Sequence, residues 1–304
     1  MKKILVTGSN GLLGQKLTEL YLKETNCKLI ATGRGNNRNL SKSGYLYEML
    51  DITDKDEVLN TINKYKPDCI IHTAAMTNVD ECELKKNECT LQNVEAVENI
   101  VEAANAVNAH LIHISTDFIF DGKNGPYTET AQPNPLSFYG ETKLLAEKTV
   151  SSKAKKWAIA RTVLVYGLVA DMSRSNIVLW AKDALENNKK IKVVDDQYRT
   201  PTLAEDLAIG CRLIEKNNAE GIFNISGKDF MNIFQLVKRV GDFFKLSLDN
   251  VEIVSSKTLN QPAKRPPITG FVIEKAIKEL GYKPHSFEQG IEIINKQFEK
   301  YSKK

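Results

Sequence analysis

The feature that most constrains this chain is its beginning, where a short apolar run leads directly into three glycines spaced GxxGxxG. The stretch reads ILVTGSNGLLG at residues 4–14, and residues that favour a helix follow it. Glycine can adopt positive φ and lets a ligand approach the backbone, while the helix that follows points unpaired N–H groups at the loop. The sequence therefore predicts a strand, a loop and a helix that together bind a pyrophosphate. Because the spacing alone is weak, a plain strand-to-helix turn is the alternative.

The alternation of strand and helix continues through the first half of the chain. We expect strands at 28–32, 45–50, 69–72 and 111–115, and helices at 54–66 and 88–106. Such alternation favours a parallel sheet with helices on both faces, because parallel strands need a crossover between them. The predicted fold class is therefore α/β with a doubly wound parallel sheet.

The charge balance argues against partners that need a strongly basic surface. The 304 residues include 42 basic and 38 acidic side chains, a net charge of +4, with no long block of one sign. We therefore predict neither a nucleic-acid nor a membrane partner. No apolar run reaches the length of a membrane span, and the chain starts in a strand instead of a signal peptide, which favours a cytoplasmic location. The five scattered cysteines predict reduced thiols and no metal site.

The end of the second expected strand indicates which dinucleotide would bind. An acidic residue normally stands there to bind the adenosine ribose 2′-hydroxyl, but this chain has Arg34 between two glycines. A guanidinium matches a 2′-phosphate, so the exchange favours NADPH and leaves NADH open as a second cofactor. The alternative is an exposed arginine in a polar loop.

The candidate catalytic residues follow the strand at 111–115. Thr116 stands at its carboxyl end, where open α/β sheets place groups that contact ligands. Tyr139 and Lys143 follow in the sequence YGETK, and positions i and i+4 share one face of a helix. A nearby ammonium should lower the pKa of Tyr139 and make it a usable proton donor. A tyrosine and a lysine at this spacing more often lie on the surface without a catalytic role, but the cofactor loop and Thr116 favour catalysis.

Six motifs, in this order and spacing, resemble the extended short-chain dehydrogenase/reductases, most closely the dTDP-4-dehydrorhamnose reductase family. They are GSNGLLG, HTAAMTNVDECE, STDFIFDG, YGETK, RTVLVYG and VVDDQYRTPT, and the likeness runs from Lys2 to about Pro284. The resemblance implies a Rossmann-like fold and an NADPH-dependent reduction of the 4-keto group of a nucleotide-linked deoxysugar. The implied reaction turns dTDP-4-dehydro-L-rhamnose into dTDP-L-rhamnose.

The resemblance also implies a division of the chain. We predict a dinucleotide-binding Rossmann domain formed by residues 1–165 and 188–227. A smaller α/β C-terminal lobe, formed by residues 166–187 and 228–304, would bind the substrate.

The resemblance implies a role for each motif position. Tyr139 would be the general acid, Lys143 would bind the nicotinamide ribose, and Thr116 would hold the substrate oxygen. The residues expected to line the cofactor are Gly8, Asn10, Gly11, Leu12, Gly14, Arg34, Asp51, Ile52, Ala74, Ala75 and Lys143.

Cations near the substrate are expected in two stretches. Arg199 lies in a turn, and Lys264 and Arg265 lie in a proline-rich segment that cannot be helical. Two adjacent phosphates need fixed cations, so all three could meet a nucleotide diphosphate; the alternative is a solvated basic loop. Asp117 completes the predicted substrate contacts.

Three positions depart from the family pattern. Met76 and Leu164 stand where many members carry aromatic residues, so the identity of the sugar is open. Lys16 replaces an acidic residue with which some members bind Mg²⁺ at a dimer contact, so we predict no metal. The resemblance still allows a homodimer.

Two other functions fit the same motifs, because fold does not fix function. The chain could be a non-catalytic NADP-binding regulatory subunit similar to the beta subunit of methionine adenosyltransferase. It could also be a nucleotide-sugar epimerase or dehydratase, which would use the same loop and Tyr/Lys pair.

Overall fold

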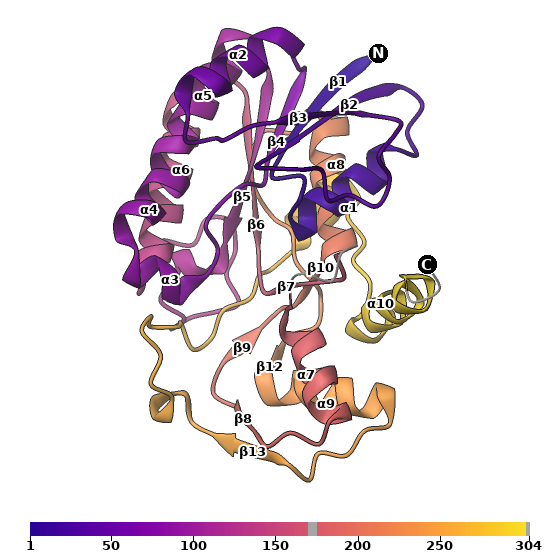
Figure 1. Cartoon of the computed structure of the whole chain (residues 1–304). Coiled ribbons are helices and arrows are strands. Elements are labelled where there is room, and N and C mark those ends of the chain that lie inside the picture. The colour runs from indigo at the N-terminus through magenta and orange to yellow at the C-terminus, as the bar shows by residue number, and fades with distance from the viewer. Residues whose placement is uncertain (170–174, 302–304) are drawn as a thin grey trace.

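A seven-stranded parallel sheet forms the centre of the molecule (Figure 1). The structure is a computed structural model that describes residues 1–169 and 175–301. The order across the sheet is β3-β2-β1-β4-β5-β6-β11, with every neighbouring pair parallel. The chain reverses direction across the sheet between β1 and β4, so the predicted doubly wound sheet is confirmed. The strands are β1 (Lys2–Thr7), β2 (Cys27–Gly33), β3 (Leu46–Met49), β4 (Cys69–His72), β5 (His110–Thr116), β6 (Trp157–Thr162) and β11 (Gly221–Asn224).

Helices cover both faces of this sheet (Figure 1). One face carries α2 (Lys55–Tyr65), α5 (Ala96–Ala106) and α6 (Phe138–Lys153), and the other carries α1 (Leu12–Tyr21) and α8 (Ala204–Asn217). Strand β1 shows why both faces need cover. Its residues Ile4 and Val6 are buried in one cluster with Leu17, and Leu5 is buried in the other with Val58. Alternate residues are apolar on both sides, as parallel strands require.

Shorter helical pieces interrupt the pattern that the sequence predicted. The expected helix over 88–106 is divided into α4 (Lys86–Thr90), a π-helical segment η1 (Leu91–Glu95) and α5. A further helix, α3 (Val79–Leu84), precedes them. Short helical segments also follow β5 at η2 (Asp117–Ile119) and lie at η3 (Ser256–Thr258) and η4 (Ala276–Leu280).

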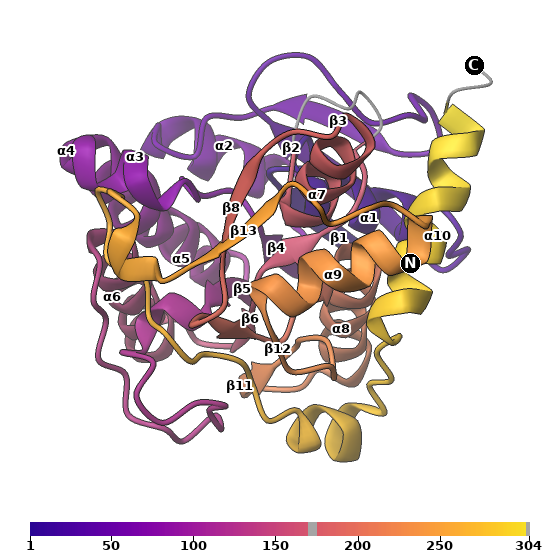
Figure 2. The ribbon, with the colours of Figure 1, turned by 90° about the horizontal axis from the view of Figure 1, so that it is seen from below.

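The C-terminal lobe is a second, smaller layer of strands and helices below the sheet in Figure 1. Its core includes Val178, Leu185, Leu236, Val240 and Ile291. Figure 2 shows α10 next to α9 at the edge of this lobe. Its elements are α7 (Ile177–Glu186), β8 (Ile191–Val194), β9 (Tyr198–Arg199), β12 (Met231–Asn232), α9 (Ile233–Phe244), β13 (Val251–Val254) and α10 (Phe287–Tyr301), with β7 (Val165–Tyr166) paired to β10 (Thr202–Leu203).

Two strand pairings cross the predicted division of the chain. Residues 188–227 were assigned to the Rossmann domain, but β8 within them pairs with β13, and β9 pairs with β12. An apolar run predicts a buried strand without saying which sheet it joins, and here the partners lie far along the chain. Residues 170–174 and 302–304, which fall in the predicted substrate-binding lobe, lie outside the described residues.

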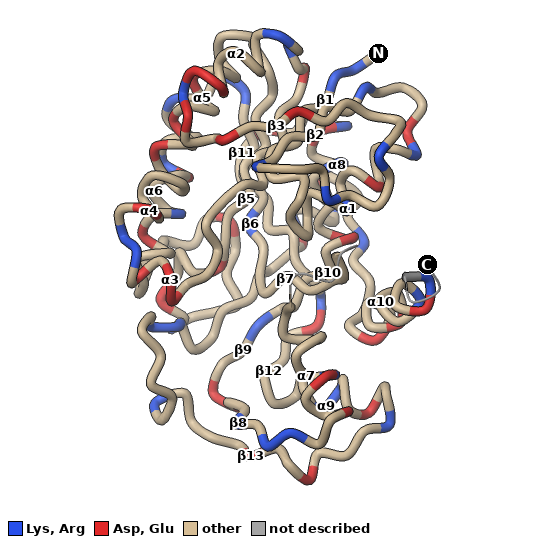
Figure 3. The backbone as a smooth tube through the Cα atoms, in the orientation of Figure 1, with Lys and Arg blue, Asp and Glu red and all other residues tan. Residues whose placement is uncertain are grey.

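The charged residues lie along both parts of the molecule. Figure 3 shows basic and acidic residues interspersed along the sheet and the lobe. Within residues 1–169 and 175–301, no helix is both long enough and apolar enough to cross a membrane.

Candidate active site

A cavity of about 680 Å³ lies along the carboxyl ends of the sheet strands. In a doubly wound sheet this edge is the expected place for a ligand. Every residue predicted to line the cofactor lines this cavity, and so do four of the five predicted substrate contacts: Thr116, Asp117, Arg199 and Arg265. The fifth, Lys264, is exposed and lies outside the cavity lining. The structure therefore brings residues from nearly the whole chain to one place.

The glycine loop forms a cradle that side chains would fill. Gly8 has φ +68°, and a Cβ there would lie 2.8 Å from the backbone nitrogen of Ala74. A Cβ on Gly14 would lie 2.3 Å from the carbonyl oxygen of Gly8. Gly11 precedes α1 and has no side chain that could cap the helix. No capping side chain therefore accepts from the first N–H groups of α1, which face the cavity. These features fit the anionic pyrophosphate of a dinucleotide.

Asn10 organises the loop that follows β2. Its side-chain amide donates to the carbonyl oxygens of Arg34 (3.3 Å) and Asn36 (3.0 Å) and to the Tyr47 hydroxyl (2.9 Å), and it accepts from the backbone N–H of Arg38 (2.8 Å). Both arginines line the cavity. The loop therefore offers two guanidinium groups where the sequence predicted one.

Tyr139 is held at the start of α6, beside Thr116. Ser137 caps the helix by accepting from the Gly140 N–H (3.3 Å), which sets Tyr139 in the first turn. The tyrosine is 8% exposed, and both it and Thr116 line the cavity. Burial raises the pKa of Tyr139 above its ordinary value, although the Thr116 contact opposes this. The pKa of Tyr139 therefore shifts upward, opposite to the direction predicted from the spacing of Tyr139 and Lys143.

The Lys143 ammonium has other acceptors. Its Nζ donates to the carbonyl oxygen of Ile114 at 2.7 Å and lies 3.1 Å from Nε2 of His113. Burial lowers the pKa of Lys143 to about 8, with Glu147 opposing the shift. Lys143 lines the same cavity as Tyr139, from the next turn of the same helix.

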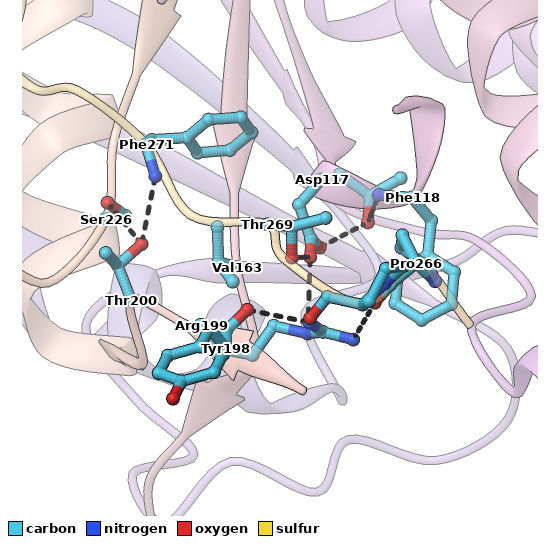
Figure 4. Close-up of polar contacts among 12 residues, drawn as sticks. Asp117, Phe118, Val163, Tyr198, Arg199, Thr200, Ser226, Pro266, Thr269 and Phe271 are labelled. Atoms are coloured by element: carbon cyan, nitrogen blue, oxygen red, sulfur yellow. Dashed lines mark hydrogen bonds and ion pairs between the residues drawn. The ribbon is translucent and has the colours of Figure 1, made fainter. Parts of the chain in front are cut away.

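Asp117 is a buried carboxylate next to the candidate proton donor. It accepts from the hydroxyls of Thr116 (3.2 Å) and Thr269 (2.5 Å), and the guanidinium of Arg199 lies 3.7 Å away. Burial raises the pKa of Asp117, while Arg199 acts in the opposite direction. The carboxylate therefore belongs to a polar network that joins the sheet to the lobe (Figure 4).

Arg199 occupies the centre of this network (Figure 4). Its guanidinium donates to the carbonyl oxygens of Tyr198 (2.7 Å), Pro266 (2.8 Å) and Pro267 (3.1 Å), besides facing Asp117. The residue is 4% exposed. Three of its five N–H groups thus have carbonyl acceptors, and Arg199 is a tie between the proline-rich segment and η2, which directly follows β5.

Arg265 has a partner of its own within the protein. It forms a two-pronged ion pair with Asp80 of α3, at 3.1 and 2.7 Å. Asp80 also accepts from the backbone N–H of Ala263 (3.1 Å). The proline-rich segment is therefore fastened to α3 at the rim of the cavity.

The three departures from the family pattern have separate surroundings. Met76 packs in a buried cluster with Cys82, Cys89 and Tyr139, whereas Leu164 lines the cavity with a φ of +41°. Lys16 is buried and pairs with Glu205 (3.1 Å) and with Gln297 of α10 (3.1 Å). In the described part of the chain, no group of three or more His, Cys, Asp or Glu side chains could hold a metal ion.

Among the residues that the sequence did not indicate are Arg38, which lines the cavity, and His113, which contacts Lys143. Arg38 lies four residues beyond Arg34, in a loop whose path could not be read from local patterns. His113 looked like part of a buried strand, although its Nε2 meets Lys143. A polar residue within an otherwise apolar strand was the signal for the second.

Comparisons with known proteins agree with this geometry. The family model described as the RmlD substrate binding domain matches residues 1–300. Methionine adenosyltransferase 2 subunit beta of Xenopus tropicalis is 31% identical over 261 residues, which cover 84% of this chain and 76% of the relative. The dTDP-4-dehydrorhamnose reductase of Aggregatibacter actinomycetemcomitans is 29% identical over 306 residues, which cover 97% of this chain and 98% of the relative.

A solved structure matches the fold over the same length. It is the dTDP-4-dehydrorhamnose reductase of Bacillus anthracis in complex with NADP, with a TM-score of 0.83 and 27% identity, and the match covers 98% of this chain and 100% of that one. The predicted resemblance is thereby confirmed, and the chain belongs to the RmlD substrate binding domain family, the family of the dTDP-4-dehydrorhamnose reductases.

Proposed function

We propose that this chain is an NADPH-dependent reductase that acts on the 4-keto group of a nucleotide-linked deoxysugar, with dTDP-4-dehydro-L-rhamnose as substrate and dTDP-L-rhamnose as product. The observation that carries the proposal is the convergence of Thr116, Tyr139 and Lys143 on the cavity that also holds the glycine loop. The reductase relatives and the NADP bound to the Bacillus anthracis structure support the choice of reaction and cofactor. NADH remains a second cofactor under this proposal.

The cofactor half of the site rests on charge and close approach. The pyrophosphate would lie over Gly8, Gly11 and the start of α1, where N–H groups face it. Arg34 and Arg38 would face the 2′-phosphate of the adenosine ribose. The remaining predicted contacts would line the rest of the dinucleotide: Asn10, Leu12, Gly14, Asp51, Ile52, Ala74 and Ala75.

The chemistry assigned to the side chains follows from where charge develops. NADPH, when bound, supplies the hydride that adds to the carbonyl carbon. Negative charge then grows on the carbonyl oxygen, which Thr116 and Tyr139 stabilise by hydrogen bonding. Tyr139 gives its phenolic proton to that oxygen and completes the alcohol. Because burial raises the pKa of Tyr139, the hydroxyl is fully protonated before the reaction.

The substrate half of the site is proposed from the residues that face the cavity. Thr116 and Asp117 would contact the sugar, and Arg265 at the rim would meet the diphosphate by exchanging its pairing with Asp80. Arg199 would act by holding Asp117 and the proline-rich segment in place, because its donors already have protein acceptors. Lys264 is left out of the proposed site, since it is exposed beyond the cavity.

The proposal is tested by incubating the purified chain with NADPH and dTDP-4-dehydro-L-rhamnose. We expect loss of absorbance at the nicotinamide band, with one dTDP-L-rhamnose formed per NADPH consumed. Sugar conversion without net NADPH oxidation would indicate an epimerase or dehydratase instead. If a panel of nucleotide-linked ketosugars produced neither result, the enzymatic proposal would be wrong.

A second candidate is supported by the relatives named methionine adenosyltransferase 2 subunit beta, which are as similar to this chain as the reductase is. In that role the chain would bind NADP without turnover and would associate with a catalytic subunit. Titration of a methionine adenosyltransferase catalytic subunit with this chain, followed by sedimentation and activity, distinguishes the two. Association without ketosugar reduction would favour the subunit.

A further inference from the structure

Three polar side chains form a row beside the cavity, on the face of the sheet that α6 covers, and one of them, His72, lines the cavity. Thr7, His72 and His113 are register partners on β1, β4 and β5, so their side chains project from the same face. Each is at most 1% exposed, and the two imidazole rings stack with their centroids 5.5 Å apart. Burial of polar groups costs free energy unless they are hydrogen-bonded. The Thr7 hydroxyl and Nδ1 of His72 hydrogen-bond to each other at 2.8 Å, so His113 is the member of the row whose burial calls for a physical reason.

The contact between His113 and Lys143 supplies one. An ammonium has three donors and no acceptor, so the Nε2 atom of His113, 3.1 Å from Nζ, must accept. Burial, together with the charge of Lys143, holds the pKa of His113 well below its ordinary value. The ring is therefore neutral, with its proton on Nδ1. The Ile114 carbonyl oxygen, at 2.7 Å, accepts a second N–H of Lys143.

Two hydrogen-bond acceptors fix the orientation of the Lys143 ammonium, whereas one acceptor does not. Lysine is a flexible four-carbon stem that ends in three rotatable donors. With Ile114 as its only acceptor, the ammonium could rotate about that one hydrogen bond. With His113 as the second acceptor, the third N–H is directed away from both, and Lys143 lines the cavity.

We infer that His113 is a positioning residue, which directs the remaining N–H of Lys143 into the cavity and stabilises the protonated ammonium. The inference rests on the proposed function in one respect, since there Lys143 serves the nicotinamide ribose and Tyr139. The contact itself is a property of the chain with or without turnover.

The other charges around Lys143 do not replace this acceptor. The ionisable neighbours in its surroundings are His72 on β4, Cys89 on α4, His113 on β5 and, on its own helix, Tyr139 and Glu147. Glu147 is itself paired with Arg161, through hydrogen bonds of 2.9 and 2.7 Å. Loss of the His113 acceptor should therefore lower the pKa of Lys143 below its present value of about 8, because a hydrogen bond to the charged form favours that form.

The test follows the titration of Lys143 directly, in protein without added cofactor. NMR of the chain with isotope-labelled lysine reports each Nζ group, and a Lys143→Gln variant assigns the signal. In His113→Leu, which lacks any acceptor, we expect the midpoint to fall by about one pH unit. In His113→Gln, whose amide oxygen reaches about as far as Nε2, we expect less than half of that fall.

Two further variants make the result decisive. His113→Asn is polar but too short to reach Lys143, so it should behave as His113→Leu does, and it replaces that variant if the leucine prevents folding. His110→Gln alters another buried histidine of β5 and should leave the Lys143 midpoint unchanged. An unchanged midpoint in both His113→Leu and His113→Asn, or an equal fall in His113→Gln, would overturn the inference.

A second readout separates this inference from the proposed reaction. If the chain reduces the ketosugar, the Lys143 limb of the pH profile of kcat should move downward in His113→Asn and return in His113→Gln. If no ketosugar is reduced, the proposed function fails, while the NMR titration still decides whether His113 sets the state of Lys143.

Discussion

The central sheet and the C-terminal lobe differ in how far local sequence patterns predict their contacts. In the sheet, strands alternate with helices, and the pairs β1–β2 and β4–β5 each span a single crossover, although β1–β4 and β6–β11 join segments as distant as those of the lobe. In the lobe, Ile191 of β8 pairs with Val251 of β13, and Arg199 bonds to Pro266. Local patterns therefore specify the sheet, whereas the lobe depends on a few buried polar ties between distant segments. Those ties should be its sensitive points.

The largest effect expected from this difference is on stability, in Arg199→Met. The substitution leaves the Asp117 carboxylate and the Pro266 carbonyl oxygen buried without their cation, and it also removes the donor to the Pro267 carbonyl oxygen. Removing one partner of a buried ion pair costs roughly 3 to 5 kcal/mol. We expect a fall of that size in the free energy of unfolding measured in urea, with weaker substrate binding at temperatures where the chain is folded.

Arg239→Met is the matched control within the lobe. Arg239 pairs with Glu288 at 2.6 Å and with Asp229 at 3.3 Å, but its side chain is 29% exposed. Exposed ion pairs contribute about 1 kcal/mol or less. If Arg199→Met lowered the free energy of unfolding no more than Arg239→Met does, the lobe would not depend on buried polar ties, and the contrast with the sheet would lose its physical basis.

The next effect concerns catalysis on the sheet side, in Tyr139→Phe. Loss of the general acid should cut turnover by roughly 10²-fold or more and leave NADPH binding nearly intact. Turnover is measured at saturating ketosugar, and NADPH binding by fluorescence titration. Tyr127→Phe removes the hydroxyl of another buried tyrosine, which donates to Asp121 (3.2 Å) outside the cavity lining, and should keep the parent rate. A Tyr139→Phe variant as fast as the parent would remove this tyrosine from the mechanism.

The same contrast explains how much the sequence could predict. The sheet, its helices and the cavity residues around the glycine loop follow from periodicity and from strand ends, both of which are local. The partner of β8 could not be predicted, because an apolar run does not specify which strand it pairs with. The hydrogen-bond acceptors of Arg199 could not be predicted for the same reason, since Pro266 and Pro267 lie in a distant segment whose sequence is also typical of a solvated basic loop.

The direction of the Tyr139 pKa was missed for a different reason. Spacing on a helix shows that two side chains share a face, but it does not show what else competes for them. Lys143 donates to Ile114 and His113, and burial has the largest effect on the pKa of Tyr139. Burial and competing acceptors are properties of the folded chain, so a pattern of residue types cannot reveal them.

A smaller effect concerns the pH dependence of stability, and it tests how much free energy the burial of Lys143 beside the central sheet costs. An unfolded lysine titrates near pH 10.4, whereas burial lowers the pKa of Lys143 to about 8. Between these values the unfolded state binds more protons, so this contribution to stability rises with pH and is lowest below pH 8. Lys143→Met should therefore stabilise the chain most below pH 8, and its advantage should shrink by up to about 3 kcal/mol as the pH rises through that window.

The measurement is the difference in free energy of unfolding between Lys143→Met and the parent across that pH range. Lost hydrogen bonds to Ile114 and His113 reduce the net gain at every pH, so the slope is more informative than the absolute value. Lys148→Met, on an exposed turn of the same helix, should show no such slope. A difference independent of pH would mean that the ammonium is not destabilised by burial.

The smallest effect separates the two arginines of the loop after β2, one predicted from the sequence and one found only in the structure. Arg34 and Arg38 both line the cavity, yet both are exposed, so solvent screens their charge. Removing either with alanine should weaken NADPH binding by roughly 10-fold, about 1.4 kcal/mol, and leave NADH binding almost unchanged. Lys42→Ala, in the same loop but outside the cavity lining, serves as the control. If only Arg34→Ala altered the NADPH-to-NADH ratio, the local pattern alone would define the 2′-phosphate site; an equal loss in Arg38→Ala would show that loop geometry, fixed by Asn10, completes it.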